Sequence, residues 1–308
     1  DFTAGYLQPV DIVLQGEITS PEVWQGLSAF LTLLRQDNAK VFLEVDPLEA
    51  LEQNEAKGLA VLSVPMQGDI DSLATRQALA RLRYAYIPHA FATAPVAVFV
   101  GGAAASKADF AQLATRAAPR VILFVLGLSF VLLLLVFRSL VVPIKAVVLN
   151  LLSVGAAYGC LVAVFQKGWG HAVLGFQHTA TIEPWLPLFL FAVLFGLSMD
   201  YHVFLLSRIR ERYDETQDNR QAVAFGLRTT GKLMTGAALI MVVVFSGFAS
   251  GALVEFQQMG FGLAIAVLLD ATLVRSVLLP ATMVVLGQLN WYLPSSLRWL
   301  PELHRRRP

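Results

Sequence analysis

Residues 195–210 are Phe195-Gly-Leu-Ser-Met-Asp-Tyr-His-Val-Phe-Leu-Leu-Ser-Arg-Ile-Arg210. This stretch places an acid and a phenol, Asp200 and Tyr201, in an otherwise apolar helix that ends in arginines. The apolar run begins at Pro184, so the helix from about 184 to 206 is long enough to cross a bilayer, which takes roughly 20 residues. A carboxylate in hydrocarbon is costly and usually faces a bundle interior or an ion path. The pattern therefore predicts that Asp200 is a titrating group on a transport path.

The composition is that of a membrane protein. Of the 308 residues, 56% are hydrophobic and 15% are charged, whereas a soluble domain usually carries about 25% charged residues. The single cysteine, Cys160, excludes a disulfide within the chain. Because the chain begins at Asp1 rather than Met, we expect further residues upstream.

Five apolar stretches predict a transmembrane domain over residues 119–290. Arginine and lysine gather in the segments after the first, third and fifth stretches, whereas the segments after the second and fourth hold only Lys167. The positive-inside rule then places the first set in the cytoplasm, with residues 1–118 on the opposite side and residues 291–308 as a cytoplasmic tail. The predicted spans are 121–137, 142–165, 184–206, 233–248 and 259–286.

Residues 1–118 alternate predicted strands with predicted helices, which indicates a small α+β module of βαββαβ type. The helix over 21–35 is marked by the Ser20-Pro21 start and by apolar residues spaced along one face. The predicted strands are 11–15, 41–45, 59–64 and 94–100, and the other predicted helices are 48–57 and 72–86.

Three more residues in the spans are candidates for function. Asp270 lies near the middle of the last span and is expected to face the bundle. Arg275 follows five residues later, about 140° around an α-helix and roughly 7.5 Å along it, so no ion pair within this helix is expected. His202, beside the Asp200–Tyr201 pair, has an ordinary pKa near neutrality and is a candidate modulator. Purely structural roles, such as a buried hydrogen bond or core packing, remain the alternatives.

Other motifs favour packing or exclude chemistry. Two glycine pairs, Gly155/Gly159 and Gly247/Gly251, have the spacing that lets helices approach closely. The sequence holds no phosphate-cradling motif, no catalytic Ser-His-Asp or Cys-His spacing and no tight metal-ligand spacing around His171 and His178. We therefore expect no enzyme activity, no metal, no bound cofactor and no nucleic-acid partner.

Four motifs carry a family resemblance, and they lie in order through residues 120–300. The chain resembles one half of an RND-superfamily transporter, and its local sequence motifs are similar to those of the MMPL family. The resemblance implies an RND-type half-transporter with five transmembrane helices behind an incomplete, porter-like extracytoplasmic module. The matching stretches are Gly196–Glu211, Thr230–Met241, Gly260–Arg275 and Leu289–Pro294.

By that resemblance, the complete protein is expected to be a proton-driven exporter of lipids or other hydrophobic molecules in the cytoplasmic (inner) membrane. Its energy source would be the proton gradient, and its partners would be membrane lipid, a hydrophobic substrate and the N-terminal half of the same transporter. The proton relay maps onto Asp200, Tyr201 and Asp270, with Arg275 and His202 as possible modulators. This chain has His202 at the position directly after the Asp-Tyr pair, where the family often has an acidic residue. A non-transporting sensor, secretion or assembly protein of the same fold is the alternative.

Adjacent helix positions point about 100° apart. Asp200 and Tyr201 therefore cannot easily share one partner, and each is expected to reach a different neighbouring helix. That arrangement suits a pseudo-symmetric interface in which the acid of one half meets the phenol of the other.

Overall fold

The computed structural model describes residues 8–37, 39–45, 51–68, 72–170, 174–179, 181–297 and 299. The chain divides into two compact units, Asp1–Leu113 and Ala114–Pro308. The following paragraphs take each unit by itself.

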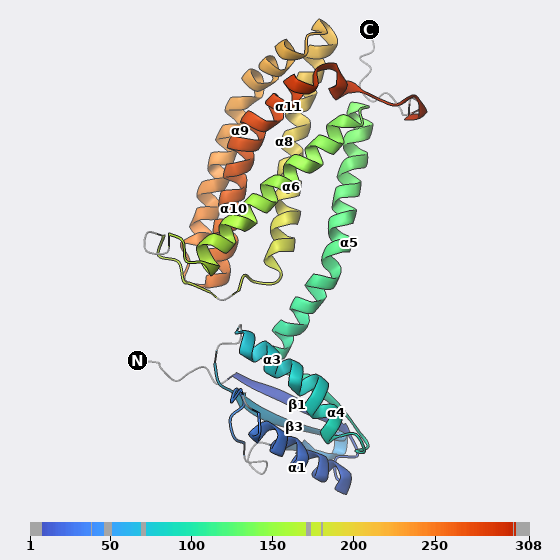
Figure 1. The fold of residues 1–308 in the computed structure, drawn as a ribbon, viewed down its shortest axis with the longest axis vertical. Helices are drawn as coiled ribbons and strands as arrows, with labels where there is room; N and C mark the ends of the chain where they lie inside the picture. Colours follow the sequence, from blue (N-terminus) through green and yellow to red (C-terminus); the bar gives the residue numbers. More distant parts are fainter. Residues whose placement is uncertain are drawn as a thin grey trace. The chain divides into compact units, whose positions relative to one another are not determined.

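The first unit is built on a four-stranded antiparallel sheet with strand order β2-β3-β1-β4. Its helices pack against the sheet (Figure 1). The side chains of β3 alternate between half-buried and buried along the strand, as expected when one face of a sheet is covered. The elements are β1 (Gln8–Gly16), α1 (Pro21–Arg35), β2 (Leu51–Asn54), β3 (Leu59–Met66), α3 (Leu73–Arg81), the π-helix η2 (Leu82–Tyr86), α4 (Ile87–Ala90) and β4 (Val96–Gly101).

The βαββαβ order is present, but one strand comes from an unexpected segment. The prediction of a helix over 48–57 was wrong. Leu51–Asn54 is strand β2, which pairs with β3, and Glu55–Lys57 is a short 3-10 turn, η1. Pairing with a neighbouring strand overrides the helix preference of these residues. The predicted strand over 41–45 is reduced to one isolated bridge between Phe42 and Met66, and residues 46–50 lie outside the described residues.

The second unit holds helices that are long enough and apolar enough to cross a membrane. Five candidate spans are present among the described residues, which confirms the five predicted from the sequence. The first helix belongs partly to each unit. The helices are α5 (Ala103–Phe137), α6 (Val141–Leu161) with the π-helix η3 (Val162–Gln166), α8 (Leu186–Thr216), α9 (Asn219–Ala249), and a last helix formed by α10 (Val254–Leu269), the π-helix η4 (Asp270–Leu278) and α11 (Leu279–Leu286).

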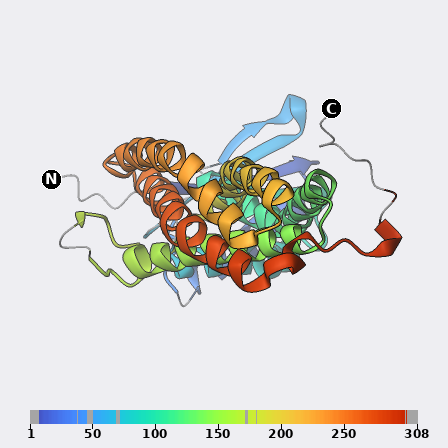
Figure 2. The same ribbon diagram turned by 90° about the horizontal axis from the view of Figure 1, so that it is seen from above.

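In the helical unit, α9 packs against both α8 and α10, and α6 lies obliquely across α8 and α10. Figure 2, which views these helices nearly end-on, shows α9 beside its two neighbours. The segment between the third and fourth predicted spans consists of the ends of α8 and α9, which meet at Gln217, a residue with a φ of 55°. Asp218 then caps α9 by accepting from the backbone N–H groups of Arg220 and Gln221.

One close contact between helices uses a glycine outside the predicted pairs. A Cβ added to Gly260 would lie 2.4 Å from the backbone nitrogen of Ala249 and 2.5 Å from the carbonyl oxygen of Phe245. By contrast, Gly155, Gly159 and Gly247 have nothing within 4 Å of such an atom. The expectation that those glycines bring helices together within this chain was therefore wrong, because their side of the helix is not covered.

Substitution of Gly260 by alanine is expected to destabilise the complete protein by about 1–3 kcal/mol, because α9 and α10 must move apart. The measurement is the thermal unfolding midpoint in detergent. Gly236→Ala on α9 is the matched control, since a Cβ there meets nothing, and it is expected to leave the midpoint unchanged or slightly raised. Equal midpoints for the two variants would contradict the close packing.

A docked segment, the 3-10 helix η5 (Gly287–Trp291), leads into the predicted cytoplasmic tail, and its last residue is the first of that tail. The fully buried Asn290 receives a hydrogen bond on its side-chain oxygen from Lys145 Nζ at 3.1 Å, and its amide donates to the carbonyls of Met283 and Gly287. Its backbone carbonyl accepts from the Ser139 hydroxyl. Farther along, η6 (Ser295–Leu297) is a short turn, and the remaining tail, except residue 299, lies outside the described residues.

Trp291 secures the same segment against the end of α8. Its ring stacks on Tyr213 with centroids 5.4 Å apart, and the guanidinium of Arg210 lies 4.6 Å from its centre. The segment that leads into the predicted tail is thus part of the helical unit, because the buried amide of Asn290 fixes it to α6 and the indole of Trp291 fixes it to α8.

Replacement of Asn290 by alanine is expected to cost about 2–3 kcal/mol, because the buried ammonium of Lys145 would lose the oxygen that accepts from it. A lowered unfolding midpoint of the detergent-solubilised protein would show this. Ser296→Ala, on the exposed turn η6, serves as the control and should leave the midpoint unchanged. An Asn290 variant as stable as that control would refute the role of the amide.

Candidate proton-relay site

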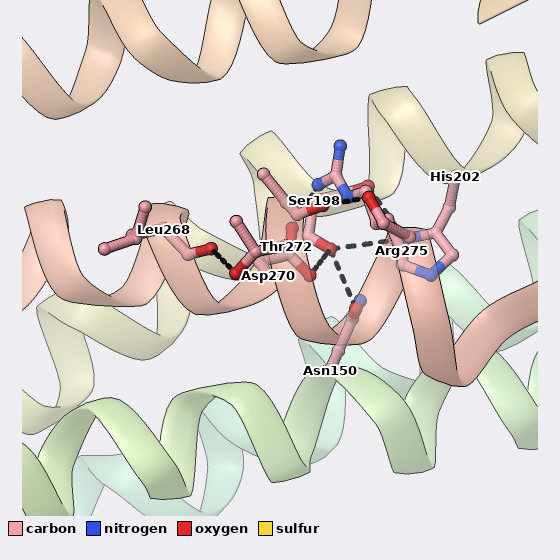
Figure 3. A network of polar contacts seen from close by, with 9 residues as sticks. Asn150, Ser198, His202, Leu268, Asp270, Thr272 and Arg275 are labelled. Atoms are coloured by element: carbon pink, nitrogen blue, oxygen red, sulfur yellow. Dashed lines mark hydrogen bonds and ion pairs between the residues drawn. The ribbon is translucent and has the colours of Figure 1, made fainter. Parts of the chain in front are cut away.

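The site lies inside the helical unit, where three helices each contribute polar side chains to an apolar core. Helix α6 contributes Asn150, α8 contributes Ser198 and His202, and η4 contributes Asp270 and Arg275 (Figure 3). All five side chains are buried. Because a polar group in hydrocarbon is stable only with partners, their convergence explains how this apolar chain tolerates them.

Asp270 and Arg275 form an ion pair between the Asp270 Oδ2 and Arg275 Nη2 atoms, with each side chain 7% exposed. The expectation of no ion pair within this helix was wrong. It assumed α-helical spacing, but η4 is a π-helix, in which hydrogen bonds run between residues five apart. The backbone N–H of Leu279, for example, donates to the carbonyl of Val274. Residues five apart therefore lie above one another, and the pair closes along one face.

Ser198 is the junction of the network. Its hydroxyl oxygen lies 2.8 Å from Asn150 Oδ1 and 3.2 Å from Asp270 Oδ1. The same oxygen is 3.2 Å from Nδ1 of His202. A hydroxyl has one proton to donate, so Ser198 can donate either to the amide of Asn150 or to the carboxylate of Asp270, but not to both at once.

The ring of His202 is held in one tautomer. Its Nδ1 lies 3.0 Å from the backbone carbonyl of Ser198. A carbonyl can only accept, so Nδ1 must carry the proton. The ring is fully buried, and Nε2 has no hydrogen-bond partner within the described part of the chain.

Tyr201 lies over the guanidinium of Arg275, whose central carbon is 4.7 Å from the ring centre. This distance fits a cation–π contact. Tyr201, Asp270 and Arg275 also line one small cavity between α8, α9 and the last helix, with a volume of about 10 Å³. The phenol and the buried carboxylate thus share a space, although they come from different helices.

Asp200 behaves differently from the other predicted site residues. It lies on the exposed side of α8, away from the network. Within the described residues it has no hydrogen-bond or ion-pair partner. The expected burial of Asp200 does not arise inside this chain, because successive side chains point about 100° apart and only the side with Ser198 and His202 faces the bundle.

The sequence missed two members of the network, Ser198 and Asn150. Both are small polar residues in apolar helices, which is a weak signal by itself. Among the described residues no group of three acidic, histidine or cysteine side chains could hold a metal ion. His178, on the loop before α8, lies with its Nε2 3.0 Å from the Gln166 carbonyl, whereas His171 lies outside the described residues.

A family model, described as the MMPL family, matches residues 13–308. The mycolic acid-containing lipids exporter MmpL11 of Mycolicibacterium smegmatis is 38% identical over 305 residues, covering 97% of this chain and 31% of the relative. The heme uptake protein MmpL11 of Mycobacterium tuberculosis H37Rv is 39% identical over 302 residues, covering 97% and 30%. The trehalose monomycolate exporter MmpL3 of M. smegmatis is 37% identical over 211 residues, covering 68% and 20%. The chain therefore spans about a third of the length of the first two curated relatives.

Proposed function

This chain belongs to the MMPL family, and on that premise we propose that it is the C-terminal half of a proton-driven exporter of lipids or other hydrophobic molecules. Two relatives carry names that describe lipid export, and another is named for heme uptake. The molecules in these names are large and wholly or partly apolar. A hydrophobic substrate is therefore the proposed class for the complete protein.

The buried pair of Asp270 and Arg275 carries the proposal of proton coupling. In the charged state the two side chains neutralise each other within the bundle. Protonation of Asp270 would leave the Arg275 charge buried without its counter-ion, which is strongly unfavourable. A conformation that gives Arg275 another partner or access to water would then gain population. Because a ligand shifts an equilibrium only by its differential affinity, this difference links proton binding to a change of conformation.

Asp200 and Tyr201 complete the proposed relay. Asp200 faces away from this chain's own bundle. This direction is expected of a group that meets the N-terminal half of the same transporter across a pseudo-symmetric interface. Tyr201, the next residue after Asp200, packs on Arg275 and lines a cavity together with Asp270. A proton that enters at Asp200 could thus affect the buried pair through one adjacent side chain.

The protein is a multi-pass membrane protein, and the proposed location is the cytoplasmic membrane. Arginine and lysine lie at the end of α5, around the junction of α8 and α9, and after α11, and the positive-inside rule supports a cytoplasmic position for these ends. This proposed orientation puts the sheet-containing unit on the extracytoplasmic side, where it would handle substrate that leaves the membrane. It also puts the C-terminus in the cytoplasm.

Reconstitution of the complete transporter in liposomes, with a pH-sensitive dye inside and an acidic medium outside, tests the proposal. We expect proton uptake that rises when a lipid substrate is present. The chain of residues 1–308 alone is expected to show none, because half of the relay is absent. A sensor, secretion or assembly protein would give no substrate-dependent uptake from the complete protein either, and that result would overturn the proposal.

A further inference from the structure

A second small cavity lies beside Asp270, on the side of α6. It is lined by Asn150, Ser153, Val154, Leu194, Phe195, Ser198 and Asp270, and its volume is about 10 Å³. One water molecule needs roughly 10–15 Å³ of such space. The cavity is thus about the size of a single water molecule, and polar side chains from all three helices of the network reach it.

Two polar atoms of this lining lack hydrogen-bond partners within the described part of the chain. They are Nδ2 of Asn150 and the hydroxyl oxygen of Ser153. The two residues are 2% and 5% exposed, respectively. Buried polar atoms in proteins nearly always have a partner, either in the protein or in ordered water. The two atoms therefore point to a ligand with hydrogen-bonding capacity that fits the cavity.

The charges around the cavity select a neutral ligand. Asp270 disfavours an anion. A cation is disfavoured because the Arg275 guanidinium already neutralises that carboxylate, and because the Asn150 amide presents a donor while its oxygen accepts from Ser198. A water molecule can accept from the Asn150 amide, donate to the Asp270 carboxylate and exchange a hydrogen bond with Ser153. Three bonds are typical of buried water.

We propose that the cavity between Asn150, Ser153 and Asp270 is a binding site for one ordered water molecule. This water connects Asp270 to α6. The occupancy of the site is independent of the proposed transport, whereas its role in proton transfer rests on the proposed function. In that role the water provides a hydrogen-bonded route to Asp270 besides the one through Ser198.

The test is a structure of the complete transporter at a resolution that shows ordered water, determined for the wild type and for Ser153→Val. We expect one density peak at hydrogen-bond distance from Asn150 and Asp270 in the wild type and none in the variant, whose methyl groups fill the cavity. Proton uptake by liposomes should fall about fivefold in Ser153→Val, the effect of losing one hydrogen bond. Ser246→Val, an exposed serine on α9 that lines neither small cavity, is the control and should keep wild-type uptake.

The possible outcomes separate the site from the function. A dry cavity in the wild type would overturn the water site, whatever the transport result. Density in the wild type with unchanged uptake by Ser153→Val would support the site and refute its role in proton transfer. Density without any proton uptake by the wild type would overturn the proposed function and leave the water site supported. If Ser153→Val does not fold, the wild-type density still tests the site. Ser153→Ala, which removes the hydroxyl but leaves space for the water, then tests by its proton uptake whether the hydrogen bond to Ser153 contributes to proton transfer, and unchanged uptake would refute that contribution.

Discussion

Replacing Asp270 with asparagine is expected to reduce proton-coupled transport by the complete transporter about 100-fold or more, the size of effect seen when a positioned proton-transfer group is lost. An amide cannot titrate in this range, and it cannot neutralise Arg275. The variant should also lose about 3–5 kcal/mol of stability, because one partner of a buried ion pair is left uncompensated. Liposome proton uptake and the unfolding midpoint in detergent measure the two effects.

The stability loss alone could silence transport, so a second variant separates the two effects. Replacing both Asp270 and Arg275 by leucine removes the pair as a unit, and such replacements are often neutral or stabilising. We expect this double variant to unfold near the wild-type temperature and still not transport protons. Transport at the wild-type rate by a stable double variant would show that the pair only holds the helices together.

Asparagine at position 200 is expected to lower proton-coupled transport by a similar factor, about 100-fold, but with a much smaller loss of stability than at position 270. Asp200 makes no hydrogen bond or ion pair within the described residues and lies on the exposed side of α8. Its proposed work is to bind and release a proton at the interface with the other half. Uptake in liposomes, compared at equal protein content, is the measurement.

Glu211→Gln is the matched control for that change. It makes the same acid-to-amide replacement on the same helix, at a residue whose exposed ion pair with Arg208 contributes little. Its transport should stay near the wild-type rate. If the position 200 variant transported as well as this control, the proposal that Asp200 carries protons would be excluded.

The sequence predicted the membrane spans, because the surrounding hydrocarbon determines their structure. Backbone polar groups in hydrocarbon must all be paired, and a long apolar run achieves this by forming a helix, so five such runs were sufficient to predict five spans. The bounds of α1 were also correct, because Ser20 and Pro21 mark a start and the apolar spacing fixes the face. Segment 48–57 was misassigned because Leu51–Asn54 pairs with the next strand, β3, and this pairing overrides the helix preference of these residues.

In the site, the sequence revealed the unusual residues but not their geometry. Asp270 and Arg275 stood out as charges in an apolar helix, yet a spacing of five excludes contact in an α-helix, and nothing in the local pattern announces a π-helix. Ser198 and Asn150 were missed because they become partners only when α6 packs across α8. The outward direction of Asp200 likewise depends on which face of α8 the other helices cover.

The π-helix η4 couples the contact between Asp270 and Arg275 to the winding of the last helix. Asp270 and Arg275 meet only while the hydrogen bonds between them run five residues apart, and in an α-helix their side chains would stand about 140° apart. Separation of the charges and local rewinding of the last helix would then be a single event. A change of charge on the Asp270 carboxyl group would then twist the last helix, so that its outer part turns about the helix axis relative to its inner part.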